Sequence, residues 1–229
     1  PQSMVYLKQA NLLQAIEQLA PSAGFQYKNG AAFFADNQYS EFDFNDKFSE
    51  GPSSTFQVKR AAFDQALAQE AEKQGAQFCF GYEVISVELS SKSSSQAKTR
   101  SKVQLKNEQE SNYSVDCRFI LDASGFARVL PRLLDLNRPS DFPVRSSIFC
   151  HIKDDINATV LTNNPYDRNK ILIETHPEHK DVWYWLIPFA DGTASLGVVA
   201  KTDYFDSLEE GDASQLLNQA IDQTSRFKS

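Results

Sequence analysis

The residues best suited to recognise a planar substrate are six consecutive positions from Trp183 to Pro188, W-Y-W-L-I-P. Because a strand turns successive side chains to opposite faces, this pattern predicts Trp183, Trp185 and Ile187 on one face, with the residues between them on the other. Two indole rings on one face make a rigid apolar wall that suits a cavity for a planar substrate, closed by Pro188 at the strand end. The same alternation is typical of ordinary sheet core, so periodicity alone leaves both interpretations open.

Lys28 is the candidate catalytic residue, and it lies in the aromatic stretch F-Q-Y-K-N-G-A-A-F. An ammonium group is a compact hydrogen-bond donor, and apolar surroundings would lower its pKa toward reactivity. The alternative is a solvent-facing lysine on a strand next to the Asn29-Gly30 turn.

Three residues are candidates for cofactor contacts. Arg60 begins a predicted helix, although cations are favoured at the opposite end, so an anionic group would compensate it. Its alternative is an i,i+4 ion pair with Asp64, worth about 0.3 to 0.5 kcal/mol. Asp122 and Gly125 follow a predicted buried strand, where open α/β sheets place ligands, and their alternative is a plain turn.

No metal site is predicted. In His176-Pro177-Glu178-His179 the proline prevents a regular helix, so a hairpin loop is the better interpretation. The three cysteines lack C-x-x-C spacing and occur in apolar runs, which predicts buried free thiols. They are Cys79, Cys117 and Cys150.

The tryptophan motif resembles the W-x-W-x-I-P signature of flavin-dependent halogenases, and the stretch 182–199 resembles the strand, turn and strand that carry it there. The segment 56–64, F-Q-V-K-R-A-A-F-D, is similar to that family's V-x-R-x-x-F-D helix start. The segment 122–125, D-A-S-G, resembles a turn of flavoproteins related to the group A aromatic hydroxylases and halogenases. The chain therefore resembles the tryptophan halogenase-like branch of the group A FAD-dependent monooxygenase superfamily.

This resemblance implies FAD as the cofactor, with Arg60, Asp122 and Gly125 near it. It implies that a flavin reductase supplies reduced FAD, that a flavin hydroperoxide oxidises halide, and that hypohalous acid reaches Lys28 to halogenate a small aromatic substrate, free or carrier-tethered. The wall formed by the tryptophan motif would keep that substrate away from the flavin. Alternatives are a related FAD-dependent monooxygenase or reductase without halogenation, and a non-catalytic small-molecule binding module.

The family's pyrophosphate-binding G-x-G-x-x-G is absent, since none of the 9 glycines has that spacing. The chain begins Pro1-Gln2-Ser3 and ends within a helix-like pattern, so we expect a fragment that is inactive alone. Its net charge of −7 gives no support for nucleic acid or an anionic membrane as a partner. No apolar run approaches the roughly 18 residues of a membrane span, and no signal peptide is recognisable, so a cytoplasmic location is expected.

These residues need a mixed α/β fold to position them: part of a Rossmann-like FAD domain interleaved with an antiparallel-sheet substrate domain, as in aromatic hydroxylases. We assign 1–24 and 60–136 to the FAD domain, 25–59 and 137–206 to the substrate domain, and 207–229 to a C-terminal helix. The predicted helices are Met4–Leu19, Arg60–Gln74 (capped by Gly75) and Phe126–Leu136. The predicted strands include short ones between 25 and 58, a pair at Gln77–Leu89 and Lys102–Leu105 around a mobile Ser90–Arg100 tip, and Asp116–Asp122, buried on both faces. Further predicted strands are Ile148–Ile152, Thr159–Leu161, Ile171–Glu174, and Val182–Phe189 joined to Ala194–Val199 by an Asp191-Gly192 turn.

Overall fold

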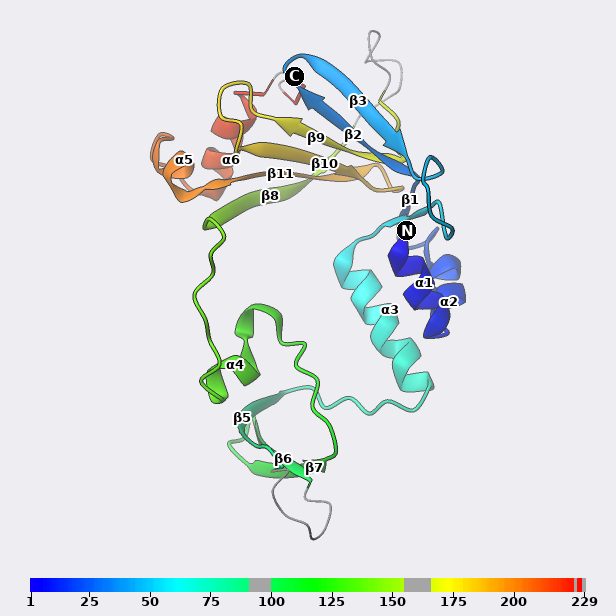
Figure 1. Cartoon of the computed structure of the whole chain (residues 1–229), viewed down its shortest axis with the longest axis vertical. Helices are drawn as coiled ribbons and strands as arrows, with labels where there is room; N and C mark the ends of the chain where they lie inside the picture. Colours follow the sequence, from blue (N-terminus) through cyan, green and yellow to red (C-terminus); the bar gives the residue numbers. More distant parts are fainter. Residues whose placement is uncertain (91–99, 155–165, 225, 228–229) are drawn as a thin grey trace. The chain divides into compact units, whose positions relative to one another are not determined.

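The computed structural model describes residues 1–90, 100–154, 166–224 and 226–227, which form a mixed α/β fold, as predicted (Figure 1). The chain divides into two compact units: one is Pro1–Gly75 with Pro143–Ser229, and the other is Ala76–Phe142. The predicted strand Thr159–Leu161 and the predicted tip between Ser90 and Arg100 lie outside the described residues. The division into FAD and substrate domains stays a prediction.

The first unit contains a six-stranded sheet. Of the described residues, its strands in spatial order are β3 (Gln38–Asp43), β2 (Gly30–Ala35), β9 (Lys170–Thr175), β10 (Trp183–Pro188), β11 (Thr193–Lys201) and β8 (Arg145–Lys153). The β2–β9 pair is parallel and the other pairs are antiparallel. The predicted Asp191-Gly192 hairpin turn joins β10 to β11, and Gly192 supplies the positive φ of 77° that such a turn needs.

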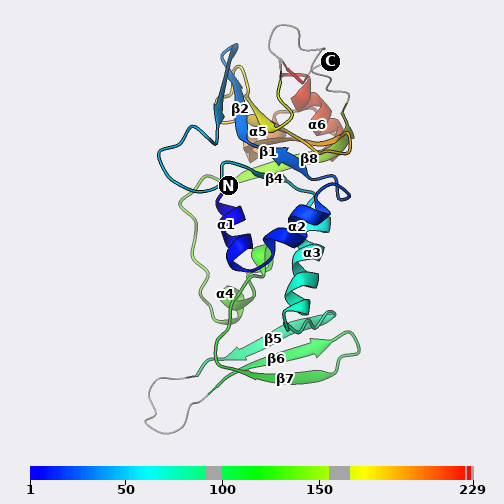
Figure 2. The ribbon, with the colours of Figure 1, turned by 90° about the vertical axis from the view of Figure 1, so that its right-hand side faces the viewer.

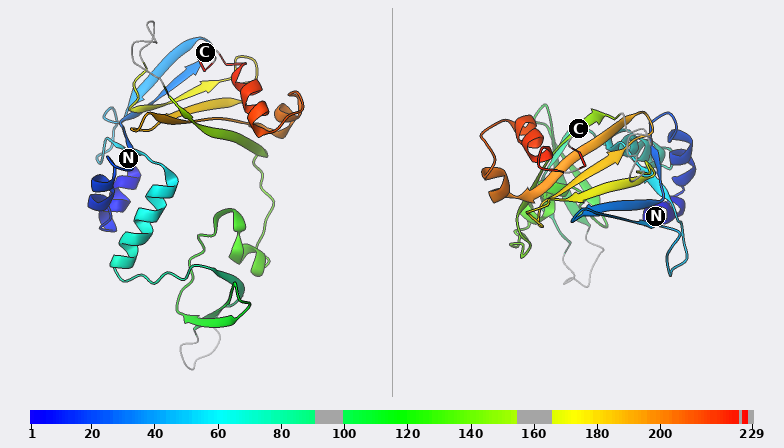
Figure 3. Two further views of the ribbon diagram at one scale, coloured as in Figure 1. Left: turned by 180° about the vertical axis from the view of Figure 1, so that it is seen from behind. Right: turned by 90° about the horizontal axis from the view of Figure 1, so that it is seen from above.

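One face of this sheet is buried beneath the C-terminal helices α5 (Thr202–Asp206) and α6 (Ala213–Ile221), drawn in orange and red in Figure 3. Tyr184 and Val198 are 0% exposed there. Helix α6 begins at Asp212, whose carboxylate accepts from the backbone N–H groups of the first turn in a capping box with Gln215. Along β10 the residues on the opposite face of the sheet are less buried than those on this side.

The other helices of the first unit lie on one side of a two-stranded pair, β1 (Gln26–Lys28) with β4 (Thr55–Gln57), as Figure 2 shows. The predicted helix Met4–Leu19 is two helices, α1 (Gln2–Gln9) and α2 (Leu13–Leu19), because Asn11 adopts a positive φ of 57° that interrupts the helical path. Helix α3 (Arg60–Lys73) ends just before Gly75, whose φ is +99°, as predicted.

The second unit is a three-stranded antiparallel sheet of β5 (Tyr82–Glu88), β6 (Ser101–Asn107) and β7 (Asn112–Cys117). The predicted buried strand Asp116–Asp122 is wrong beyond Cys117, and Phe119 and Leu121 are 77% and 84% exposed. The reason is that no described strand pairs with residues 118–122, so no ladder extends along them.

The predicted helix Phe126–Leu136 is also wrong in its extent. A 3₁₀ turn, η1 (Gly125–Ala127), and a short helix, α4 (Val129–Leu133), replace it. Arg128 lies between them with a left-handed φ of 44°, which ends one element and begins the next.

The cysteines are free thiols, as predicted, but their predicted burial is wrong: Cys79 and Cys150 are exposed and Cys117 is half-buried. Cys150 is exposed because it lies on the edge strand β8, which pairs only with β11. Within the described ranges, no helix has the length and apolar character needed to cross a membrane.

Candidate functional site

The tryptophans of β10 lie on the face of the sheet opposite the C-terminal helices. Along β10 half-buried and buried residues alternate, with Trp183, Trp185 and Ile187 half-buried and the positions between them buried. The predicted shared face is therefore confirmed, and it is the less covered face. Its role in substrate binding stays a prediction.

Trp185 is held in one orientation by the neighbouring strand β11 and by β8, which lies beyond it. It pairs in register with Gly197 of β11, which pairs with Phe149 of β8, so the three share one face. The indole Nε1 donates to Ser195 Oγ at 3.2 Å, and the Trp185 and Phe149 rings lie 5.9 Å apart, tilted by 43°. Gly197 is required here, because a Cβ at that position would lie 2.6 Å from Phe149 Cβ and would overlap the indole ring.

At the other end of this face, the Arg145 guanidinium lies over the Trp183 ring. The guanidinium carbon of Arg145 lies 5.1 Å from the Trp183 ring centroid. Lys201, the register partner of Arg145, pairs instead with Asp181, with Nζ and Oδ2 2.8 Å apart. We call the surface made by Arg145, Phe149, Trp183, Trp185 and Ile187 the tryptophan face.

Pro188 does not line the tryptophan face, which corrects its predicted place in the cavity. The Pro188 side chain is fully buried on the opposite face. Pro188 is four residues after Tyr184 on the same strand, so its side chain points to the same buried face as Tyr184. Pro188 still pairs with Ala194 of β11. Its backbone carbonyl accepts a 3.0 Å hydrogen bond from Nε2 of Gln57, which is itself only 4% exposed. The end of the tryptophan strand is thereby fixed to the end of β4.

A second link joins the same two segments. Lys59, just before α3, forms an ion pair with Asp191 of the β10–β11 turn, and its ammonium lies 5.5 Å from the Phe189 ring centroid. This hydrogen bond from Lys59 lowers the pKa of Asp191 to about 2. The Gln57–Pro188 and Lys59–Asp191 contacts bring the start of α3 to the end of the tryptophan motif.

Lys28 is the last residue of β1 and is half-buried. Its Nζ lies 6.0 Å from the Phe44 ring centroid, and burial lowers its pKa below the usual lysine value. No ion pair of Lys28 occurs among the described residues. The following residue, Asn29, donates its backbone N–H to Asn169 O at 3.0 Å, which joins Lys28 to the main sheet.

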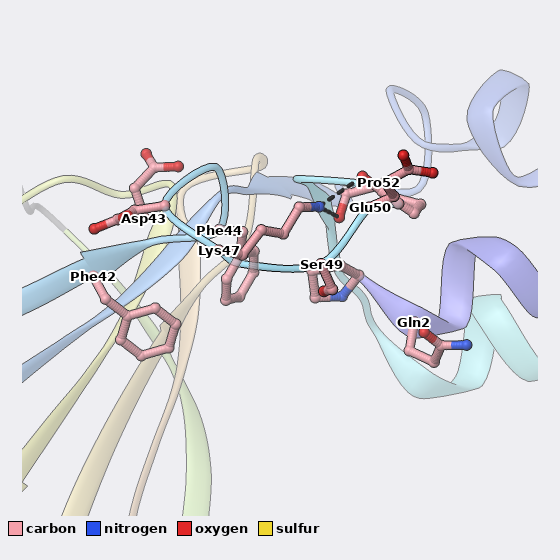
Figure 4. Close-up of a pocket in the computed structure, with 11 residues that line it drawn as sticks. Gln2, Phe42, Asp43, Phe44, Lys47, Ser49, Glu50 and Pro52 are labelled. Atoms are coloured by element: carbon pink, nitrogen blue, oxygen red, sulfur yellow. Dashed lines mark hydrogen bonds between the residues drawn. The ribbon is translucent and has the colours of Figure 1, made fainter.

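Phe44 also borders a cavity of about 250 Å³ formed by the 42–52 loop and the start of the chain (Figure 4). Lys47 closes this loop, because its ammonium donates at 2.6 Å to each of the carbonyls of Gly51 and Pro52. Unlike Lys47, Lys28 donates no side-chain hydrogen bond to a described backbone carbonyl. The Lys28 amine is therefore free to donate to a reagent at this edge.

In the structure Arg60 forms the ion pair with Asp64 that was the alternative to a cofactor contact. At the start of α3 the Arg60 Nε and one terminal nitrogen donate to the two Asp64 oxygens at 3.1 and 3.0 Å. The Arg60 side chain is 78% exposed, so this pair is weak and the guanidinium stays accessible to an anion. Its predicted cofactor contact stays a prediction.

Asp122 and Gly125 form a capped turn in the second unit. The Asp122 carboxylate accepts from the backbone N–H groups of Ser124 at 2.9 Å and Leu130 at 3.0 Å. Hydrogen bonds from Ser124 lower the pKa of Asp122, and Gly125 supplies a positive φ of 58°. This is the plain-turn alternative, and these residues lie in a different unit from Lys28.

His176 uses both ring nitrogens within the fold. Its Nδ1 accepts from the backbone N–H groups of Glu178 and His179 at 3.0 Å, and its Nε2 lies 2.7 Å from Gln223 Oε1. It thus organises the turn before β10. Over the described part of the chain, no group of three or more His, Cys, Asp or Glu side chains is arranged to hold a metal ion.

The structure thus places the segments of Lys28, Arg60 and the tryptophan motif in one unit. Their side chains have different neighbours: Lys28 lies over the Phe44 ring, and Arg145 lies over the Trp183 ring. Sequence reasoning missed Gln57, Phe149, Arg145 and Ser195. Period-two alternation on β8 and β11 is a signal that would have placed three of them on one face. Gln57 carries no such signal, because its partner is 131 residues away.

No family model matches the chain, and no curated protein matches it. Among solved structures, a flavoprotein/dehydrogenase from Cytophaga hutchinsonii is 33% identical over 100% of this chain and 52% of that chain, with a TM-score of 0.83. The chondrochloren halogenase of a myxobacterium, an FAD-dependent halogenase, is 22% identical over 97% and 47%, with a TM-score of 0.70. A geranylgeranyl bacteriochlorophyll reductase-like protein from Thermoplasma acidophilum is 15% identical over 97% and 51%, with a TM-score of 0.66. The chain has the fold of these proteins and spans about half the length of each.

Proposed function

We propose that the protein is an FAD-dependent oxidoreductase that halogenates a small aromatic substrate, with halide and a flavin reductase as its other partners. The observation that carries this proposal is Lys28: a half-buried amine with an aromatic neighbour, a lowered pKa and no described ion pair. Lysines on protein surfaces normally stay solvated, so an amine kept in this state suits a reaction. The fold shared with an FAD-dependent halogenase supports the same assignment.

The residues present would make only part of an FAD site. None of the 9 glycines has the G-x-G-x-x-G spacing, so a backbone cradle for the pyrophosphate is not among these 229 residues. The resemblance predicts cofactor contacts in each unit separately: Arg60, with its exposed guanidinium, in the first and the Asp122–Gly125 turn in the second. Bound reduced FAD would activate oxygen, and oxygen would supply the oxidising equivalents that convert halide to hypohalous acid.

The role of Lys28 follows from its protonated amine. Its N–H groups donate to the oxygen of hypohalous acid, which polarises the bond between oxygen and halogen. The halogen then bonds to a carbon of the aromatic ring, that carbon loses its proton, and water leaves, so that ArH + HOX gives ArX + H₂O. The tryptophan face would hold the aromatic ring, and the lowered pKa keeps the proton of Lys28 easy to exchange.

A related FAD-dependent monooxygenase or reductase is the second candidate. The likeness to a protein described as a flavoprotein/dehydrogenase favours it, since that match has the higher identity. A non-catalytic small-molecule binding module is a third candidate, because the tryptophan face needs no cofactor to bind a planar ligand. A cytoplasmic location stays a prediction for all three.

Product mass separates these candidates in one experiment. The polypeptide that carries this chain together with its flavin-binding residues is incubated with FAD, a flavin reductase, NADH, oxygen, bromide and a panel of aromatic compounds. Halogenation replaces one ring hydrogen by bromine, which gives an isotopic doublet in the mass spectrum. A product that gains only oxygen or only hydrogen assigns the second candidate, and no product despite ligand binding assigns the third.

A further inference from the structure

We propose that the tryptophan face binds a planar aromatic ligand that carries an anionic group, and that Arg145 binds this group. The proposal deepens the proposed function by naming the substrate class. It adds Arg145, which has no assigned role, to the residues that select the substrate.

Arg145 lies at the tryptophan face, and its N–H groups donate no hydrogen bond to a described carboxylate. Its guanidinium lies 5.1 Å from the Trp183 ring centroid, and a cation–π contact fixes its position without an acceptor oxygen. In the described ranges Arg145 forms no ion pair. A guanidinium in this state can donate two parallel N–H bonds to a carboxylate.

The acidic neighbour of Arg145 forms its ion pair with another cation, although Arg145 is close enough to contribute to the lowered pKa of Asp181. Asp181, just before β10, is paired with Lys201 at 2.8 Å. Lys201 therefore offsets the negative charge that would repel an incoming anion. The two basic residues that face each other across β8 and β11 thus differ: Lys201 forms the ion pair with Asp181, and the N–H donors of Arg145 are in no ion pair among the described residues.

The apolar part of the proposed site lies beside this cation. Phe149 is 59% exposed although its ring contacts Trp185, so it offers a ring edge to a ligand. Trp185 cannot turn away, because Ser195 binds its indole nitrogen and Gly197 leaves room for its ring. Exposed aromatic rings next to a free cation complement an aromatic anion in both shape and charge.

The spacing of the groups sets the size of the ligand. Arg145 and Phe149 are four residues apart on β8, which corresponds to roughly 13 Å between their Cα atoms at about 3.3 Å per residue. A two-ring aromatic with an anionic group attached to one ring spans this distance once the long arginine side chain is included. A neutral aromatic of the same shape fills the apolar part alone.

The test uses the 229-residue chain and the probe 2-naphthoate, with the neutral 2-naphthamide as its isostere. The chain has only 2 tryptophans, so two indole N–H signals in a ¹⁵N NMR spectrum report binding at this face, and Trp183→Phe assigns them. We expect 2-naphthoate to shift both signals and to bind about tenfold more tightly than 2-naphthamide. Arg145→Gln should abolish this preference without changing the binding of 2-naphthamide.

Lys153→Gln is the matched control, because Lys153 is an exposed cation on the same face of β8 at its far end. It loses the same charge and should leave the tenfold preference intact. Equal loss in the two variants, equal affinity for the acid and the amide, or indole signals that stay still at saturation would each overturn the proposal. Binding is measured without flavin or halide, so a failure of halogenation leaves this result unchanged, and a failure here leaves the reaction assignment unchanged.

Discussion

The side-chain amide of Gln57 donates a 3.0 Å hydrogen bond to the backbone carbonyl of Pro188, and this contact ties the segment before α3 to the end of the tryptophan strand. The same amide nitrogen also lies 3.3 Å from the carbonyl oxygen of Arg168. Gln57 is 4% exposed, so this amide lies away from bulk water.

We therefore expect Gln57→Ala to lower the free energy of unfolding by about 1 to 3 kcal/mol, the usual cost of leaving buried carbonyls without a donor. Urea unfolding of the 229-residue chain measures this change. Gln65→Ala, at an exposed position of α3, is the control and should change the unfolding free energy little. Equal effects of the two substitutions would show that the Gln57–Pro188 contact does not join the segments.

Gly197→Ala should displace the Trp185 ring. The added Cβ would lie 2.6 Å from Phe149 Cβ, so the indole has to rotate and lose its hydrogen bond to Ser195. In a Trp183→Phe background Trp185 is the sole emitter, and its fluorescence should move to longer wavelength as the ring enters water. Ser147→Ala, on the exposed strand β8, should leave the emission unchanged. An unshifted spectrum in the Gly197 variant would mean that the ring is not packed on β11.

Asp191→Asn should reduce stability near neutral pH and have a much smaller effect near pH 2. The folded pKa of Asp191 is about 2, below the usual 3.8, so its stabilisation is fully present above 3.8 and is lost as the pH falls from 3.8 to about 2. Because the side chain is 40% exposed, the contribution is under about 1 kcal/mol. Urea unfolding at both pH values measures it, with Lys59→Gln as the partner variant. A difference of undiminished size at pH 2 would assign the effect to something other than the Lys59 ion pair.

Local patterns predicted the parts of the fold that depend on neighbours in the chain. The alternation at Trp183, Trp185 and Ile187 is set by the pleat of a single strand, and the Asp191-Gly192 turn by the positive φ that Gly192 accepts. The end of α3 at Gly75 has the same local origin.

Contacts between distant segments were not predictable in this way. The apolar run after Cys117 has the composition of a strand buried on both faces, but a strand also needs a partner ladder, and none of the described strands supplies one. The contact of Arg145 with Trp183 and the Gln57–Pro188 bond depend on register and on strand order in the folded sheet. No periodicity within one segment encodes either of them.

The 229-residue chain should not retain FAD after purification. Arg60 and the Asp122–Gly125 turn are predicted cofactor contacts in separate units, and none of the 9 glycines supplies the pyrophosphate cradle. The purified protein mixed with excess FAD and desalted should be colourless, as its visible absorbance will show. Stoichiometric flavin absorbance would require a cofactor-binding element among these residues that lacks the glycine fingerprint.

The most direct test of the account concerns Lys28 in the flavin-containing polypeptide supplied with a reductase, oxygen, halide and an aromatic substrate. Lys28→Ala should abolish the halogenated product while NADH oxidation and peroxide release continue, because the lysine acts after halide oxidation. Lys28→Arg should fail as well, since a planar guanidinium does not replace a compact ammonium. Lys73→Ala, which removes a surface lysine paired with Glu70, is the control and should keep full activity. Mass spectrometry of the product decides the outcome: loss of halogenation with continued peroxide release is the predicted result, and a Lys28→Ala variant that halogenates at the parent rate would contradict the account.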